Sequence, residues 1–396
     1  MNSKPFSIAF TFLVSVVGAC LANTTASAAV WYVDKDNTGT EVGTSWSTAF
    51  NTIQEGIDAA YDDGGGEVWV AEGVYGSIVT AENVYLYGGF AGTEDRFDQR
   101  DWHAHGTIID GGGQACCVVG ADHATLDGFT IRNGTPGMEN VACSPRVANC
   151  TFTNNSGAAM SNSNSSPTVT DCSFCDNHGN LDDWNEPNGA MFNSESSPTV
   201  VNCTFSGNTA RSGAAMVNAD GSPTLTGCTF MSNIGFSNGG AMVNFFSSPV
   251  LTDCTFMDNV ATGGDSPMPG SGGAIWNDTY CFPTLTDCVF LRNTAELMGG
   301  AIATYDTCEA TLVNCLFSEN TAKKGGALAG DALFSPTLIN CTLVGNSAED
   351  AGAMYDQEFC FPTFINCILW SSAPNEIRTG SSSLYAITYS CVRGGV

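Results

Sequence analysis

An eight-residue pattern returns along the chain and constrains the fold more than any other feature. Its consensus is Pro-Thr-Leu-Thr-Asp-Cys-Thr-Phe, and successive copies are 22 to 34 residues apart. The copies centre on Cys150, Cys172, Cys203, Cys228, Cys254, Cys288, Cys315, Cys341 and Cys367. Such a period is typical of solenoids, whose units bury their apolar faces only against neighbouring units. We therefore expect the 396 residues to form one elongated domain.

Apolar and polar residues alternate within each unit. Leu225, Cys228 and Phe230 are expected to face inward, the threonines between them outward, and Gly227 to occupy a bend. The small-residue run Gly239–Met242 is expected to form a third strand. These features predict an all-β chain, a right-handed parallel β-helix of about nine to eleven coils. Since strands lie about 4.8 Å apart, the rod should be on the order of 50 Å long.

One stretch departs from this strand pattern. Residues 53–61 have the spacing of a short amphipathic helix. We expect this helix to cover the N-terminal end of the solenoid, where a sheet edge would otherwise be unpaired. Residues 29–110 should then hold the cap and the first coils, and residues 111–396 the repeats.

The first 28 residues have the features of an export signal. Lys4 precedes the apolar segment Phe6–Ala19, which is too short to span a bilayer. Ala26–Ala28 fits a signal-peptidase site, whereas Val17–Cys20 fits a lipobox in which Cys20 would carry a lipid. We therefore predict a secreted or cell-surface protein, with an outer-membrane lipoprotein as the alternative. No later segment is a transmembrane candidate.

The chain is strongly acidic, with 12 Lys and Arg against 40 Asp and Glu and a formal net charge of −28. Phosphate binding needs clustered Lys and Arg, so nucleic acid is excluded as an expected partner. Direct docking on an anionic membrane is disfavoured for the same reason. This charge favours solubility outside the cell.

Eighteen cysteines in an exported chain would ordinarily suggest a disulfide framework. We instead expect the repeat cysteines to stack as one buried internal column, which does not converge on a metal. Two others differ, because Cys281 and Cys308 each lie four residues before an inward leucine in adjacent coils. Their Cα atoms should be about 5 Å apart, so we predict a Cys281–Cys308 disulfide. Cys360 has the same position two coils further on, beyond bonding range.

Two coils carry longer turns at the same place in the unit, residues 178–187 and 261–270. They are three coils apart, roughly 14 Å along the axis. The shorter turns between them contain Arg211 and Phe236. This layout predicts a shallow groove between two raised walls, which we call the two-loop groove.

The walls of the two-loop groove contain acidic and aromatic side chains. The candidate ligand-binding residues are Asp182, Asp183, Trp184, Glu186 and Asp265. Of these, Asp182 and Asp183 are candidate calcium ligands, and no other cofactor is expected. If the groove is catalytic, the residues expected to supply the acid and the base are Asp182, Asp183, Glu186 and Arg211. The alternative is that both turns are insertions without a ligand, which solenoids tolerate.

Two parts of the sequence resemble known families. Phe-x-x-Asn, as in Phe230 and Asn233, followed by a run such as Gly272–Ile275 resembles the repeats of chlamydial polymorphic outer membrane proteins. The segments Val68–Tyr75 and Tyr87–Glu94 resemble the opening of bacterial pectin-lyase-like β-helix proteins. The resemblance extends from about residue 31 to 391 and implies the fold. Chlamydial members continue into an outer-membrane barrel, which has no counterpart before the sequence ends at residue 396.

The repeat indicates one fold, but proteins with this fold have several different functions. The leading hypothesis is a non-catalytic surface or secreted β-helix for adhesion or glycan association, with a polysaccharide or a neighbouring cell surface as partner. The competing hypothesis is an extracellular polysaccharide lyase or glycoside hydrolase acting in the two-loop groove. A third hypothesis is an envelope spacer without a specific ligand. The sequence does not predict an oligomeric state.

Overall fold

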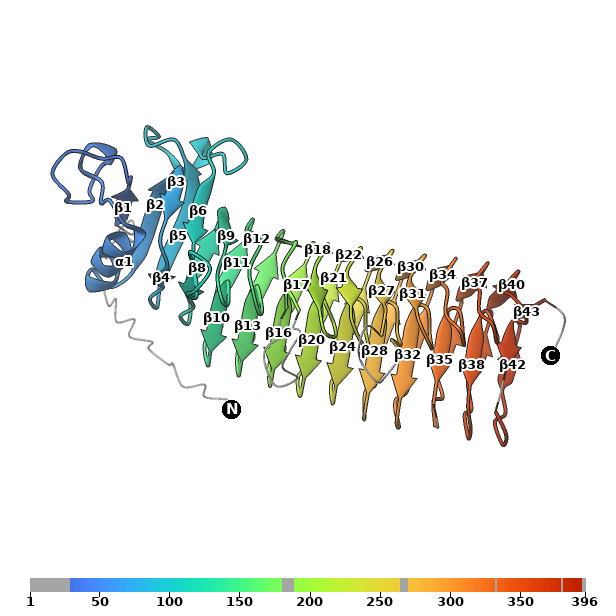
Figure 1. Ribbon diagram of the computed structural model, residues 1–396. Coiled ribbons are helices and arrows are strands. Elements are labelled where there is room, and N and C mark those ends of the chain that lie inside the picture. Colours follow the sequence, from blue (N-terminus) through green and yellow to red (C-terminus); the bar gives the residue numbers. More distant parts are fainter. Residues whose placement is uncertain (1–28, 180–188, 264–269, 332, 379, 394–396) are drawn as a thin grey trace, which may run out of the picture.

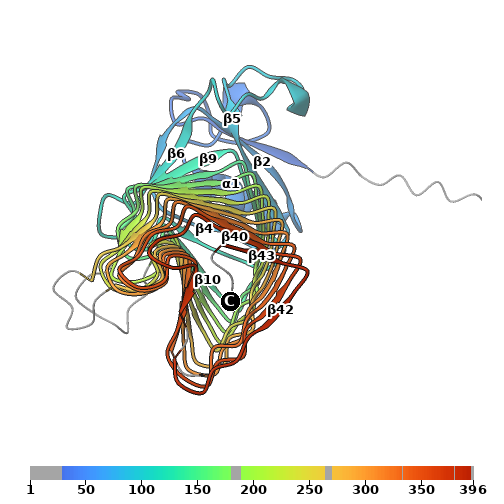
Figure 2. The same cartoon turned by 90° about the vertical axis from the view of Figure 1, so that its right-hand side faces the viewer.

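The chain winds into a rod of stacked coils, with an N-terminal part that stands above the rod at one end (Figure 1). The computed structural model describes residues 29–179, 189–263, 270–331, 333–378 and 380–393. Viewed along the axis, successive coils superpose on a common three-sided outline, and the N-terminal part projects beyond it (Figure 2). The predicted signal, residues 1–28, lies outside the described residues.

Three long parallel sheets form the sides of the rod. Sheet A has 14 strands, sheet B has 13 and sheet C has 12 within the described residues. Sheet A consists of β1 (Val30–Val33), β2 (Gly66–Ala71), β5 (Val84–Phe90), β8 (Thr125–Asp127), β11 (Arg146–Ala148), β14 (Thr168–Thr170), β17 (Thr199–Val201), β21 (Thr224–Thr226), β25 (Val250–Thr252), β29 (Thr284–Thr286), β33 (Thr311–Val313), β36 (Thr337–Ile339), β39 (Thr363–Ile365) and β42 (Ala386–Thr388).

Sheet B consists of β3 (Gly73–Tyr75), β6 (Thr107–Asp110), β9 (Phe129–Arg132), β12 (Thr151–Thr153), β15 (Ser173–Cys175), β18 (Thr204–Ser206), β22 (Thr229–Met231), β26 (Thr255–Met257), β30 (Val289–Leu291), β34 (Leu316–Ser318), β37 (Thr342–Val344), β40 (Ile368–Trp370) and β43 (Cys391–Val392). Sheet C consists of β4 (Ile78–Val79), β7 (Val118–Val119), β10 (Met138–Val141), β13 (Met160–Ser163), β16 (Met191–Ser194), β20 (Met216–Ala219), β24 (Met242–Phe245), β28 (Ile275–Asp278), β32 (Ile302–Tyr305), β35 (Leu328–Gly330), β38 (Met354–Asp356) and β41 (Ile377–Arg378).

A fourth, short sheet lies between sheets B and C in the middle of the rod. Sheet D consists of β19 (Thr209–Ala210), β23 (Ile234–Gly235), β27 (Val260–Ala261) and β31 (Thr294–Ala295). Two short 3-10 helices, η1 (Trp46–Thr48) and η2 (Phe97–Gln99), belong to the N-terminal part. The sheets confirm the predicted parallel β-helix. They also contain coils that the repeat does not mark, because β2 to β7 lack the cysteine octet.

The inward and outward directions agree with the alternation in the sequence. Leu225, Cys228 and Phe230 are buried, whereas Thr226 is exposed. One expectation needs correction, because the Gly-Gly-Ala run is a turn that precedes the third strand. Gly239 has a φ of +63°, where a Cβ atom would come 2.4 Å from the Met242 carbonyl oxygen. The strand β24 begins only at Met242.

The repeat phenylalanines form a continuous stack inside the rod. Neighbouring rings have centroids 4.5 to 4.9 Å apart and are within 6° of parallel. The members are Phe152, Phe174, Phe205, Phe230, Phe256, Phe290 and Phe317. Because the coil spacing equals the strand spacing, one aromatic residue per coil is sufficient to fill this column.

Two asparagine ladders satisfy polar groups inside the coils. In the first, each amide donates to the next side-chain oxygen at 2.9 to 3.0 Å. It contains Asn155, Asn177, Asn208, Asn233, Asn259, Asn293, Asn320 and Asn346. The second follows sheet C with 2.8 Å bonds and contains Asn140, Asn162, Asn193, Asn218, Asn244 and Asn277. Buried amides are stable here because, along each ladder, the side-chain N–H of one asparagine is paired with the side-chain oxygen of the asparagine in the next coil.

The predicted capping helix is present as α1 (Ile53–Asp62). Thr52 and Glu55 form a capping box at its start. Its buried face includes Ile53 and Ile57, which belong to the same core cluster as Val68 of sheet A. The helix therefore covers the N-terminal end of the core, as expected.

The repeat cysteines form the predicted buried column. The backbone N–H of Cys150 donates to Cys172 Sγ, and that of Cys172 donates to Cys203 Sγ, both at 3.4 Å. Cys281 and Cys308 are also neighbours in stacked turns, with the Cys281 N–H donating to Cys308 Sγ at 3.1 Å. Both are free thiols in the structure. Their proximity agrees with the sequence analysis, and the disulfide itself stays a prediction.

Candidate functional site

Most of the two-loop groove lies outside the described residues. This applies to Asp182, Asp183, Trp184, Glu186 and Asp265. Two residues of its expected floor are described, Arg211 directly after β19 and Phe236 directly after β23. They follow neighbouring strands of sheet D, a short sheet that the sequence analysis did not predict, with Arg211 half-buried and Phe236 exposed. The site assigned to these loops therefore remains a prediction.

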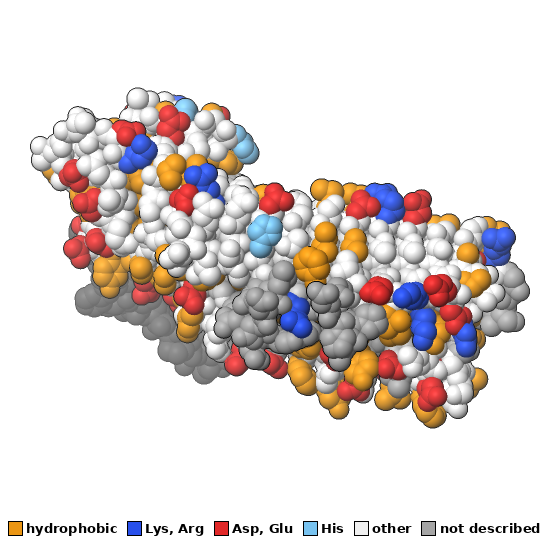
Figure 3. Space-filling view, viewed as in Figure 1, with side chains coloured by type: hydrophobic (Ala, Val, Ile, Leu, Met, Phe, Trp, Pro, Cys, Tyr) orange, Lys and Arg blue, Asp and Glu red, His pale blue; other side chains and the backbone are white. Residues whose placement is uncertain are grey.

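A different groove is formed entirely by described residues. It has a volume of about 500 Å³ and follows the bends between sheets A and B, beneath a loop of the N-terminal part. We call it the Trp102 groove. Its lining includes Trp102, His103, Asn149, Thr151, Asp171 and Asn202. Figure 3 shows the step at which the raised N-terminal part meets the lower rod.

The floor of the Trp102 groove repeats with every coil. The residue before each repeat cysteine adopts the left-handed conformation, with φ of +50° at Asn149, +53° at Asp171 and +53° at Asn202. Asn and Asp tolerate this conformation better than other non-glycine residues do. Asn149 Nδ2 donates to Asp127 Oδ1 at 3.0 Å, and Asn202 Nδ2 donates to Asp171 Oδ1 at 3.2 Å. The bends therefore present a line of carboxylate and amide groups along the axis.

Hydroxyl groups run beside this line. Thr151, Ser173 and Thr204 each follow a buried cysteine and lie partly exposed on the outer face of sheet B. Their strands pair in register, Thr151 with Ser173 and Ser173 with Thr204. The groove thus combines a row of amides with a row of hydroxyls, both repeating at the coil spacing of about 4.8 Å.

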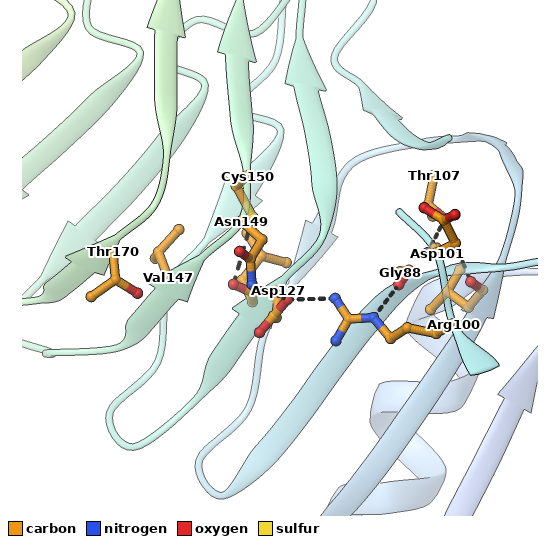
Figure 4. Close-up of polar contacts among 12 residues, drawn as sticks. Gly88, Arg100, Asp101, Thr107, Asp127, Val147, Asn149, Cys150 and Thr170 are labelled. Atoms are coloured by element: carbon orange, nitrogen blue, oxygen red, sulfur yellow. Dashed lines mark hydrogen bonds and ion pairs between the residues drawn. The ribbon is translucent and has the colours of Figure 1, made fainter. Parts of the chain in front are cut away.

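A buried ion pair fixes the overhanging loop to the rod (Figure 4). The Arg100 guanidinium donates through Nη2 to the Asp127 carboxylate and through Nε to the Gly88 carbonyl oxygen at 2.9 Å. It also lies over the rings of Phe97 and Trp102, 5.2 and 4.8 Å from their centroids. A desolvated cation over aromatic faces is held more strongly than an exposed one. Arg100 therefore positions Trp102 above the groove.

Glycine allows the loop to approach this closely. At Gly89, where φ is +90°, a Cβ atom would come 2.6 Å from the Trp102 Cα atom. At Gly128, where φ is +80°, it would come 2.5 Å from Arg100 Nη2. Any larger residue at either position would displace the loop that carries Trp102.

Asp101 shapes the tip of the loop. Its Oδ1 accepts hydrogen bonds from the backbone N–H groups of His103 and Ala104, at 3.0 and 3.1 Å. His105 Nδ1 lies 3.0 Å from Glu72 Oε2, which ties the end of the loop to the first coils. The histidines are thus held in a turn, and within the described ranges no three His, Cys, Asp or Glu side chains converge to hold a metal.

The Trp102 groove carries little charge. Among its lining residues, His103 and Asp171 are the ones with titratable acid or imidazole groups, and none is Lys or Arg. The nearby Asp127 carboxylate is matched by Arg100. The surface is therefore suited to hydrogen bonding and stacking rather than to holding a strongly charged ligand.

The Trp102 groove could not be predicted from the repeat, for a physical reason. Trp102 precedes the first cysteine octet, and its place in one groove with Asn149 and Asp171 depends on the fold of the loop between β5 and β6. The sequence feature that could have indicated the groove is the pair of glycines after Tyr87. Such glycines indicate that another backbone segment packs closely, but they do not identify that segment.

The described part of the chain contains no helix that is both long enough and apolar enough to cross a membrane. No curated protein matches the sequence. Among solved structures, the Agl-KA catalytic domain has a TM-score of 0.54 at 11% identity, over 93% of this chain and 69% of that chain. An identity this low shows a common fold only.

Two further structures are similar at TM-scores below 0.5. The A-module of the mannuronan C-5 epimerase AlgE4 of Azotobacter vinelandii has a TM-score of 0.40 at 15% identity, over 92% of this chain and 100% of that chain. PfbA, a surface adhesin of Streptococcus pneumoniae, has a TM-score of 0.41 at 12% identity, over 86% of this chain and 88% of that chain.

The family comparison agrees with the fold. The family model described as the right handed beta helix region matches residues 98–237 and 183–348. These overlapping matches span more than half of the chain, and the three long parallel sheets run through the same residues. The chain belongs to the right-handed β-helix family.

Proposed function

We propose that this chain is a secreted or cell-surface β-helix that binds a neutral polysaccharide lengthwise in the Trp102 groove and so associates with a glycan-coated surface. The observation that supports the proposal is an indole that lines one groove together with a repeating row of amides and hydroxyls. Aromatic faces stack on apolar faces of ligands, while a few placed polar groups fix their orientation. A sugar chain offers both kinds of surface.

The direction of the ligand follows from the repeat. Asn149, Asp171 and Asn202 are in successive coils, so equivalent polar groups recur along the axis of the rod. A polymer with its own repeat can make the same contacts in each coil, whereas a compact small molecule can use only one or two. This favours a chain laid parallel to the axis.

The charge of the groove favours a neutral chain. Asp171 lies in the floor, no lining residue is Lys or Arg, and the whole chain has a net charge of −28. An anionic polysaccharide would meet repulsion without a matching cation. An adhesive role needs only binding, which this surface offers.

The test is binding and turnover on a panel of neutral glucans, alginate and polygalacturonate. We expect neutral chains to bind and Trp102→Ala to weaken binding about tenfold, because an aromatic stack contributes about 1 to 1.5 kcal/mol. Trp370→Ala is the matched control, since Trp370 is an exposed indole at the far end of the rod. Isothermal titration calorimetry measures both variants.

Two results would redirect the proposal. Unchanged glycan affinity in Trp102→Ala would show that the glycan does not bind in the Trp102 groove. New reducing ends or unsaturated products, lost in Asp183→Ala or Arg211→Ala, would instead support the lyase or hydrolase hypothesis for the two-loop groove.

A further inference from the structure

A row of exposed aromatic and aliphatic side chains follows one edge of the rod. We call it the aromatic edge. Its members are 37 to 56% exposed and comprise Phe245, Phe246, Tyr280, Phe282, Tyr305, Leu333, Phe359 and Phe361. Soluble proteins seldom expose contiguous apolar surface of this kind, and where they do it usually marks an interaction site.

The aromatic edge is formed by the ends of sheet C strands and by the turns between sheet C and sheet A. These turns follow β24, β28, β32, β35 and β38, which stack in register along the C-terminal half of the rod. In Figure 3, apolar and acidic side chains gather along the lower edge of this half. The row therefore continues over five coils.

The fold does not require aromatic residues at this edge. In the three coils before β24, the residue that follows the sheet C strand is polar. Asn164, Glu195 and Asp220 hold, in three successive coils, the place that Phe246 takes in the fourth, directly after paired residues of sheet C. The earlier coils stack equally well, so the rings of the later coils serve something other than the stacking of coils.

Three of these aromatic residues adopt a left-handed backbone conformation, which is unfavourable for bulky side chains. Phe246, Tyr280 and Phe359 have φ values of +46°, +52° and +55°. The left-handed conformation costs about 1 to 2 kcal/mol for an ordinary side chain, and less for Asn. Asn164 shows that asparagine fits such a turn, with φ +49°. Aromatic residues at strained turn tips indicate a role in recognition.

The charges around the aromatic edge have one sign. Asp278, Asp306, Glu309 and Glu358 are in the same turns, and the sequence of these turns contains no Lys or Arg. A second copy of the chain would bring the same acidic surface and a net charge of −28, so self-association is disfavoured. An anionic membrane is disfavoured for the same reason.

Rings flanked by carboxylates attract cations in two ways. Lys and Arg side chains are favoured over aromatic faces, and their charge complements neighbouring acids. Apolar residues between the cations would cover the remaining ring surface. We propose that the aromatic edge docks a basic, apolar segment of a partner protein, separately from the Trp102 groove.

The probe is a synthetic peptide of alternating Lys and Leu, compared with one of equal length that alternates Glu and Leu. The variant is the triple substitution Phe246→Asn, Tyr280→Asn and Phe359→Asn. Asparagine suits the left-handed turn, so the melting temperature should be unchanged or higher. The Lys–Leu peptide should lose roughly tenfold or more of its affinity, which corresponds to removing several cation–π contacts.

Two controls separate this surface from others. Trp102→Ala should leave peptide binding unchanged, and so should Val141→Asn, which removes an exposed apolar residue of the same edge in an earlier coil. Affinity should also fall as salt is raised, because the contact is partly ionic.

Three results would overturn the proposal. The first is equal binding of the Glu–Leu peptide, and the second is full Lys–Leu binding by the triple variant. The third is loss of self-association or of neutral-glycan binding in the triple variant while peptide binding is kept, which would assign the edge to a second copy or to a sugar.

Discussion

The Arg100 guanidinium and the Asp127 carboxylate form an ion pair in which the two side chains are only 4% and 9% exposed. The pair joins the loop that carries Trp102 to the strand β8. Removing one partner of a buried pair leaves the other charge without compensation, at a cost of about 3 to 5 kcal/mol. We expect Arg100→Ala to open the loop locally and to expose the Gly89 and Asp101 amides to hydrogen exchange.

The control is Arg96→Ala, because Arg96 pairs with Asp98 on the surface. Exposed pairs contribute little, so this variant should exchange like the unmodified chain. Equal protection of the Gly89 amide in Arg100→Ala would show that the ion pair does not hold the loop.

A substitution at Asn233 tests the first asparagine ladder, which contains Asn155 to Asn346. Its Nδ2 donates to the Phe205 carbonyl oxygen at 3.0 Å and to Asn259 Oδ1 at 2.9 Å. In Asn233→Asp the ionised carboxylate cannot donate either bond, so the rod should be destabilised by about 3 kcal/mol or more at neutral pH. Burial would raise the pKa of the new carboxyl above its unfolded value, so the penalty should shrink as pH falls through the raised pKa.

Asn154→Asp is the matched control, because Asn154 is exposed and its backbone also has a positive φ. Urea unfolding at neutral and acidic pH measures both variants. A neutral-pH loss of stability as small as that of Asn154→Asp would contradict the assigned role of the ladder.

The thiols should differ sharply in reactivity. Cys391 is exposed, whereas Cys228 is fully enclosed. Burial raises the pKa of Cys116 to about 11 and that of Cys117 to about 12, which keeps both protonated at neutral pH. Alkylation of the native protein followed by peptide mass mapping should modify Cys391 first and the column cysteines only after unfolding. Modification of Cys228 as fast as that of Cys391 would argue against a closed column.

The predicted Cys281–Cys308 disulfide has a direct test. Protein isolated after export is digested without reduction, and the linked peptide is sought by mass. We expect the linked peptide, because the two side chains are in adjacent turns. Free thiols at both positions would refute the bond, and Cys360 gives an internal control because it is too far along the rod to join either.

The lowered pKa of Asp110 predicts that the stability of the fold depends on pH. Hydrogen bonds from the Gly112 N–H and the Asn133 amide, together with Arg132, hold the pKa of Asp110 below its ordinary value. A lowered folded pKa stabilises the fold above the unfolded pKa, and this contribution disappears as pH falls through the folded pKa. Asp110→Asn should therefore cost roughly 1 kcal/mol at neutral pH and flatten the acid limb of the stability curve. Thermal unfolding between neutral pH and about pH 3 measures it, and an unchanged acid limb would contradict the assignment.

Sequence alone specified the rod because its repeat is local. The alternation within each octet predicts which side chains face inward, and the stacking of coils places equivalent residues in one column. The stack of Phe230 on Phe256 and the buried column at Cys228 follow from that rule. The third strand was displaced by a few residues, because a small-residue run fits a tight turn as well as a strand and only backbone geometry distinguishes them.

The candidate surfaces were decided by tertiary structure. Trp102 lines one groove with Asn149 and Asp171 because Arg100 and two glycines hold a loop of the N-terminal part against the rod, and no repeat encodes that arrangement. The aromatic edge likewise needs the register of five coils to become one surface. Sequence by itself determined the stacking rule, since that rule depends on neighbours one period apart. The structure alone decided which non-repeating segments meet, since such contacts depend on packing between parts of the chain that share no period.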